Sequence, residues 1–106
     1  DIPVHPAAIT VHISIGNSDG KLSQHQWSNF YAAVDSTICA HADRIHGVWC
    51  SLPNAPFVNA CWSISIQESM ARSFRAALAM RARQYQQESI AWLQGETLFI
   101  QAEQHG

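Results

Sequence analysis

Charged residues are scarce in this sequence, and the basic ones are unevenly placed. Only 13% of the residues carry a charge, against about a quarter in an average soluble domain. Lys21 is the single lysine, and the formal net charge is -2. This balance argues against a nucleic-acid binder that works by neutralising phosphates. A surface so poor in charge favours contact with further copies of the chain, because weakly charged faces are typical of homo-oligomer interfaces.

Several chemical signatures are also missing. The three cysteines, Cys39, Cys50 and Cys61, include no C-x-x-C pair, which argues against a zinc knuckle or a thioredoxin-type site. Neither a P-loop nor a dinucleotide fingerprint occurs. We therefore expect neither a metal ion nor a cofactor, and the sequence leaves open whether the protein is an enzyme.

Long apolar runs are absent too, so we expect no membrane contact. No leader peptide is recognisable, which favours a cytoplasmic protein. The chain begins with Asp1 rather than Met, so a preceding segment is left open.

What the sequence does contain begins with a regular alternation over residues 9–15. Its apolar side consists of Ile9, Val11, Ile13 and Ile15, and its polar side of Thr10, His12 and Ser14. This pattern predicts a half-buried strand.

Two amphipathic helices are expected. Ser23 is a suitable N-cap for the first, which should end near residues 41–43. The second should run from about residue 67 to residue 85. The apolar stripes are formed by Trp27, Phe30, Tyr31, Val34 and Ile38 in the first helix and by Met70, Phe74, Ala77, Leu78 and Tyr85 in the second. Apolar positions at this spacing share one helix face.

Between the helices lie two strand-like runs, residues 44–51 and 59–66, joined by a loop that contains two prolines. In the second run Ala60, Trp62, Ile64 and Ile66 alternate with smaller polar residues. In the first run we expect Ile45 and Trp49 on the core side. The outward positions are then His46, Val48 and Cys50.

The C-terminal region predicts a hairpin. Residues 89–93 and 96–100 flank Gln94 and Gly95, and a glycine at such a connection suits a tight turn. The last strand would extend the sheet beside the fourth strand or pair with a second subunit. Trp92 is then either a core residue or an interface anchor.

This order of elements predicts a ferredoxin-like α+β sandwich, β-α-β-β-α-β plus an extra C-terminal strand. Its antiparallel sheet would have strand order 4-1-3-2, with both helices on one face. We expect a single domain over residues 1–106, with residues 1–8 as an irregular N-terminal arm.

One end of this sheet would collect three connections, residues 16–21, 52–57 and 86–88. The first leads into a helix N-terminus, which favours an anion. The predicted ligand-binding residues are Asn17, Ser18, Lys21, Gln87 and Glu88. They would hold an anionic or polar small molecule, with a nucleotide as one option. The competing interpretation is an ordinary turn and cap, and the carboxylate of Asp19 works against an anion.

The sheet face that the helices leave uncovered is the second candidate site. The predicted interface residues on it are His12, His46, Val48, Cys50 and Cys61. Histidines and cysteines projecting together also suit a transition metal or a Cys/His nucleophilic pair. We favour contact with a second copy, because single His and Cys residues are usually just packed.

Two classes of function follow. The first is a non-catalytic, homo-oligomeric binding protein for such a small molecule or for a protein partner. The second is a small dimeric enzyme with an acid/base in a cleft, for which the candidates are His12, His46 and Glu88.

Overall fold

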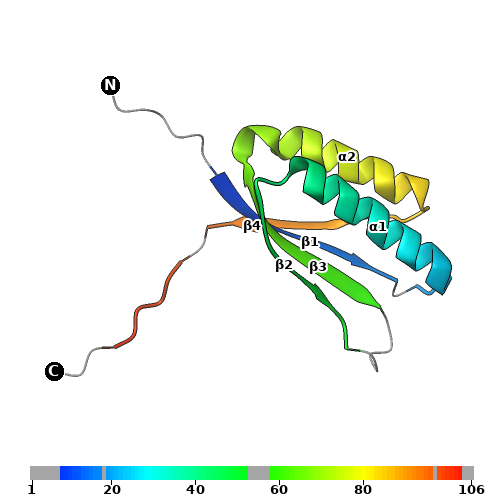
Figure 1. Ribbon diagram of the computed structural model, residues 1–106, viewed down its shortest axis with the longest axis horizontal. Coiled ribbons are helices and arrows are strands. Elements are labelled where there is room, and N and C mark those ends of the chain that lie inside the picture. The colour runs from blue at the N-terminus through cyan, green and yellow to red at the C-terminus, as the bar shows by residue number, and fades with distance from the viewer. Residues whose placement is uncertain (1–7, 18, 53–57, 97, 104–106) are drawn as a thin grey trace.

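One antiparallel sheet and two helices form two layers (Figure 1). The computed structural model describes residues 8–17, 19–52, 58–96 and 98–103. The elements in chain order are β1 (Ala8–Gly16), α1 (Gln24–His41), β2 (Arg44–Cys50), β3 (Asn59–Gln67), the 3-10 turn η1 (Glu68–Met70), α2 (Ala71–Gln84) and β4 (Ala91–Gly95). The sheet has the order β2-β3-β1-β4, and both helices cover the same face. The predicted ferredoxin-like order of elements is confirmed.

The central pair of strands, β1 and β3, explains why the alternating pattern forms a core. Ile13 lies opposite Trp62, and Val11 lies opposite Ile64. Directly opposed residues of an antiparallel pair point to the same face. All four side chains are completely buried beneath the helices, so the predicted alternation in β1 is confirmed.

Helix α1 begins where the sequence predicts, because Ser23 caps it. The Oγ atom of Ser23 accepts a hydrogen bond from the Gln26 backbone N–H at 3.2 Å. In return, Oε1 of Gln26 accepts one from the Ser23 backbone N–H at 2.8 Å. This capping box satisfies donors that a helix start otherwise leaves unpaired. The helix ends at His41, inside the predicted range.

The second helix is shorter than the predicted residues 67–85. Gln67 is still paired with Ala8 in the sheet, so the ladder holds it in an extended conformation. A single 3-10 turn then leads into α2 at Ala71. As a result Met70, which was expected to face inward, is exposed.

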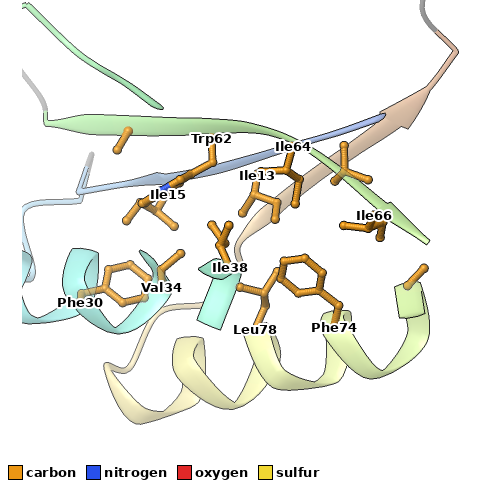
Figure 2. Packing of buried hydrophobic residues seen from close by; sticks show 13 residues of the cluster. Ile13, Ile15, Phe30, Val34, Ile38, Trp62, Ile64, Ile66, Phe74 and Leu78 are labelled. Atoms are coloured by element: carbon orange, nitrogen blue, oxygen red, sulfur yellow. The ribbon is translucent and has the colours of Figure 1, made fainter. Parts of the chain in front are cut away.

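Both helices press their apolar stripes onto the sheet (Figure 2). The largest completely buried side chains are Trp62, Phe30, Phe74, Ile13, Ile38, Ile64, Ile66, Val11 and Val34. The ring of Trp92 stands edge-on to that of Phe74, with 5.4 Å between their centroids. The Arg75 guanidinium lies 5.6 Å from the Trp92 ring centroid. Of the two roles left open for Trp92, the structure therefore shows packing against the core.

Strand β2 contains an irregularity in its pairing with β3. Ile45 lies opposite Ile64, but the register shifts before Gly47, and Val48 then lies opposite Trp62. A β-bulge of this kind places one extra residue in a strand, which turns every later side chain to the other face.

The second half of β2 is consequently reversed relative to the prediction. Val48 and Cys50 lie opposite residues that face the helices, whereas Trp49 lies opposite Cys61 on the uncovered face. The side chain of Trp49 is 57% exposed there. Placing Trp49 in the core, and Val48 and Cys50 on the outer face, was wrong.

The C-terminal region also differs from the prediction. Gln94 and Gly95 belong to β4, where Gly95 lies opposite Thr10 of β1, so they do not form a hairpin turn. The described residues 98–103 are in no strand and lead away from the sheet (Figure 1). The described part of the expected extra strand, residues 96 and 98–100, therefore forms no strand within the protomer. A segment forms a strand only where a neighbouring strand hydrogen-bonds to it, and residues 98–103 leave the sheet instead.

Candidate functional site

The uncovered side of the sheet, called the open face below, is defined by the strand register. Its described side chains include Ala8, Thr10, His12 and Ser14 of β1, Arg44 and Trp49 of β2, Cys61, Ser63, Ser65 and Gln67 of β3, and Ala91 and Leu93 of β4. The face is mostly polar and carries little charge, with the guanidinium of Arg44 at one end and the large apolar groups Trp49 and Leu93 exposed on it.

A pocket of about 580 Å³ lies at one end of the sheet. It forms where β1 and β2 end and where β3 and β4 begin, so all four strands contribute. We call it the open-face pocket. Its lining residues from the strands and their ends are Ser14, Ile15, Gly16, Trp49, Cys50, Ser51, Asn59, Ala60, Cys61 and Ala91. The connections add Asp19, Gln87, Glu88 and Ser89.

The pocket is rich in hydrogen-bond acceptors, because two carboxylates line it. Asp19 is already engaged, since its Oδ2 lies 3.8 Å from Nζ of Lys21 and its Oδ1 accepts from the Lys21 backbone N–H at 3.1 Å. Glu88 is exposed in the connection that precedes β4. Trp49 lines the β2 side of the pocket and Glu88 the β4 side. A carboxylate and an exposed indole in one pocket suit a ligand that presents N–H groups or a positive charge.

The predicted ligand-binding residues are divided between two places. Gln87 and Glu88 line the open-face pocket. Lys21 instead lines a smaller hollow of about 290 Å³ on the helix side, together with Gln86. Ser18 lies outside the described residues. The expected meeting of the first and third connections is present at the pocket, but Lys21 is not part of its lining.

Asn17 has a structural task in the turn before α1. Its Nδ2 donates to the Leu22 carbonyl at 2.8 Å, and its Oδ1 accepts from the Leu22 N–H at 3.1 Å. The N-terminus of α1 is likewise occupied by its own capping box, formed by Ser23 and Gln26. These contacts match the competing interpretation of an ordinary turn and cap.

The two histidines of the predicted interface pair with serines of β3. Nε2 of His46 lies 2.7 Å from Oγ of Ser65, and Nε2 of His12 lies 3.4 Å from Oγ of Ser63. Neither histidine lines the open-face pocket. Among the candidate acid/base residues, only Glu88 does.

The cysteines of the predicted interface are separated by the sheet. Cys61 is on the open face, whereas Cys50 is on the helix side close to Tyr31 of α1. Burial raises the pKa of the Tyr31 phenol, and the nearby Cys50 and Asp35 raise it further. A direct Cys50–Cys61 pair does not fit this placement.

Two further properties concern the described residues as a whole. Nowhere among them do three or more His, Cys, Asp or Glu side chains gather in a way that could hold a metal ion. None of their helices is both long and apolar enough to cross a membrane.

Trp49 is the pocket residue that the sequence interpretation missed. The signal was Gly47, because a glycine inside a strand often marks a bulge. An ideal Cβ on Gly47 would lie 3.0 Å from the Trp49 ring, so the absent side chain makes room for the indole.

Comparison with known proteins supports the fold class. No protein-family model and no curated protein matches the sequence, but several solved structures match its fold. A dimeric ferredoxin-like protein of unknown function from Thermobifida fusca superposes with a TM-score of 0.60 at 11% identity, covering 85% of this chain and 92% of that one. The chain thus has a ferredoxin-like α+β fold.

Two other structures are similar at the same level. One is a DUF3240 family protein from Shewanella baltica, with a TM-score of 0.53, 8% identity, and coverage of 95% of this chain and 100% of that one. The other is a hydroxynitrile lyase from Passiflora edulis, with a TM-score of 0.54, 17% identity, and coverage of 89% and 99%. At such low identities the likeness concerns the fold alone.

Proposed function

We propose that this chain is a non-catalytic binding protein that works as a homodimer and holds a polar small molecule in the open-face pocket. The observation that carries the proposal is the pocket itself. Its volume of about 580 Å³ lies within the range of roughly 300–1,000 Å³ that is usual for small-molecule sites. It combines an exposed indole with several polar groups, which is the composition such sites have.

The lining favours a ligand with hydrogen-bond donors. The carboxylate of Glu88 accepts hydrogen bonds and repels anions. The Trp49 indole offers a flat surface for an aromatic ring or an organic cation. The sequence suggested an anionic or polar small molecule. Of these two options we propose the polar one, as a neutral or cationic ligand with N–H groups.

The homodimer follows from the open face. Exposed Trp49 and Leu93 lie on a face that carries little charge, and such faces are usual in homo-oligomer interfaces. The Thermobifida fusca neighbour is described as dimeric, so this fold occurs as a dimer elsewhere. Two sheets packed through their open faces would also screen the pocket from bulk water.

The enzymatic alternative would have to use Glu88 as its acid/base, because it is the candidate that lines the pocket. One fold neighbour is named a hydroxynitrile lyase, but that likeness concerns the fold. Binding without reaction remains the proposal.

A fragment screen followed by NMR tests the ligand site. The chain has four tryptophans, and each indole N–H gives a separate signal. We expect neutral and cationic N–H-bearing fragments, such as aminopyridines and benzamidine, to shift the Trp49 signal. The Trp62 signal serves as an internal control, because its indole is buried and donates to Asp35.

Glu88→Gln should weaken binding of the cationic fragments by roughly tenfold, since a charge-assisted hydrogen bond becomes a neutral one. Glu68→Gln is the matched control, because Glu68 lies in η1 at the other end of β3. If benzoate fragments shift Trp49 while benzamidine does not, the proposed ligand chemistry is wrong. If fragments are recovered chemically converted, the enzymatic alternative replaces the binding protein.

A further inference from the structure

The C-terminal segment, residues 98–102, is the most exposed apolar part of the described chain. It begins with Leu98, Phe99 and Ile100, whose side chains are 82%, 81% and 99% exposed. Figure 1 shows the segment leading away from both layers. Three adjacent large apolar side chains in water are unfavourable, and an exposed apolar patch marks an interaction site.

Strand β2 offers a matching edge. It is the outermost strand on its side of the sheet, and within the described residues it pairs with β3 alone. Ile45, Val48 and Trp49 are all exposed along it. Edge strands are usually protected by charged residues, proline, bulges or a cover. β2 has Arg44 at its start and a bulge after Ile45, but its end, Val48–Cys50, carries neither a charge nor a proline.

The apolar side chains of the two segments are distributed in the same way. On β2, Ile45 and Val48 point to the helix side, and Trp49 points to the open face. In an extended chain successive side chains alternate, so Leu98 and Ile100 share one side and Phe99 takes the other. A strand formed by residues 98–102 beside β2 would bring two apolar residues to the helix side and one aromatic to Trp49.

The segment cannot reach β2 of its own chain. Gly95, Thr10, Ser65 and Arg44 lie in one row across the sheet. A strand added beyond β2 would lie four strand spacings from Gly95, about 19 Å. The three residues from Gly95 to Leu98 span about 11 Å at most. The partner edge must therefore belong to another molecule.

We propose that the C-terminal segment of one protomer forms a fifth strand beside β2 of a second copy of this chain, and that the exchange is reciprocal. Each copy has one segment and one β2 edge, so a two-fold axis pairs both and leaves neither free. This inference rests on the homodimer of the proposed function. It adds that the added strand runs past Trp49 and Cys50, and so forms part of the wall of the partner's open-face pocket.

Truncation tests the exchange. The wild-type chain should sediment at twice 11.8 kDa, while a chain that ends at Glu96 should dimerise at least about tenfold more weakly, because the main-chain and apolar contacts of the added strand are lost. Phe99→Lys should act in the same direction. Met80→Lys is the matched control, since Met80 is an exposed apolar residue of α2. Far-UV circular dichroism establishes that each variant is folded.

Cross-linking locates the contact. In a chain whose native cysteines are replaced by serine, Ile100→Cys combined with Ile45→Cys or with Val48→Cys should give a covalent dimer on mild oxidation. Ile100→Cys combined with Met80→Cys should remain monomeric on a non-reducing gel.

The two proposals fail in different ways. A truncated chain that dimerises as tightly as the wild type, with no cross-link from either pair, overturns the strand exchange and leaves the dimer intact. A wild-type chain that is monomeric at every concentration overturns both.

Discussion

Trp62 shows how a single residue links the core to its surroundings. Its side chain is completely buried, yet its Nε1 donates to Oδ1 of Asp35 at 2.9 Å. The ring of Tyr31 lies 5.0 Å from it, centroid to centroid. A buried indole N–H without a partner would be destabilising, so Asp35 allows the largest core side chain to be a tryptophan.

The phenol of Tyr31 makes stability sensitive to alkaline pH. Burial first, and then Cys50 and Asp35, raise its pKa in the folded protein above the ordinary 10.0. The folded state therefore holds this proton more tightly than the unfolded state, and stability falls as pH rises above 10. Tyr31→Phe should reduce this loss.

Urea unfolding at pH 8 and again above pH 10 measures the effect. Tyr85→Phe is the control for a tyrosine in the same layer. Equal alkaline losses in the wild type and in Tyr31→Phe would show that Tyr31 does not contribute.

At the scale of elements, the first helix owes its starting point to one side chain. The capping box of Ser23 and Gln26 satisfies two backbone N–H donors at the start of α1. Ser23→Ala should lower the free energy of unfolding by about 1 kcal/mol. Ser28→Ala, in the exposed interior of the same helix, should change it by a few tenths at most and in the stabilising direction.

Chemical denaturation of the two serine variants separates the cap from simple loss of a hydroxyl. If both substitutions have the same effect, the cap does not determine the stability of α1.

At the scale of the whole molecule, the open face determines the expected assembly. Trp49→Arg introduces a charge into the face that the proposed dimer covers, and burying an unpaired charge is costly. The variant should be monomeric in sedimentation experiments, whereas Met80→Arg on the helix layer should keep the wild-type mass.

Thermal unfolding gives an independent check of this expectation. The melting temperature of a dimer rises with protein concentration, so the wild type should show such a rise and Trp49→Arg should not. A melting temperature of the wild type that is independent of concentration would contradict the dimer.

Much of the fold could be predicted from the sequence, because local patterns determine it. Alternation over residues 9–15 places β1, and Ser23 places the start of α1. The apolar stripes of the two helices can be recognised from helical spacing alone. The order of elements is compatible with only a few sheet topologies. The start of α2 was less predictable, since Gln67 is held in the sheet by Ala8, a contact far away in the sequence.

The site was predicted only in part. Gln87 and Glu88 line the pocket, as expected from the end of the sheet at which their connection lies. Lys21 does not line it, since the side of a turn on which a side chain lies depends on three-dimensional packing. Trp49 was missed because a bulge of one residue exchanges the two faces of a strand.

The sequence by itself determined the order of elements, the helix cap and the central core, since each depends on residues close together in the chain. Only the tertiary structure decided which side of the sheet Trp49 faces and which side chains of the meeting loops line the pocket. It also showed that residues 98–103 leave the protomer's own sheet. These features depend on pairing between distant strands, and a shift of one residue in that pairing changes them without altering any local pattern.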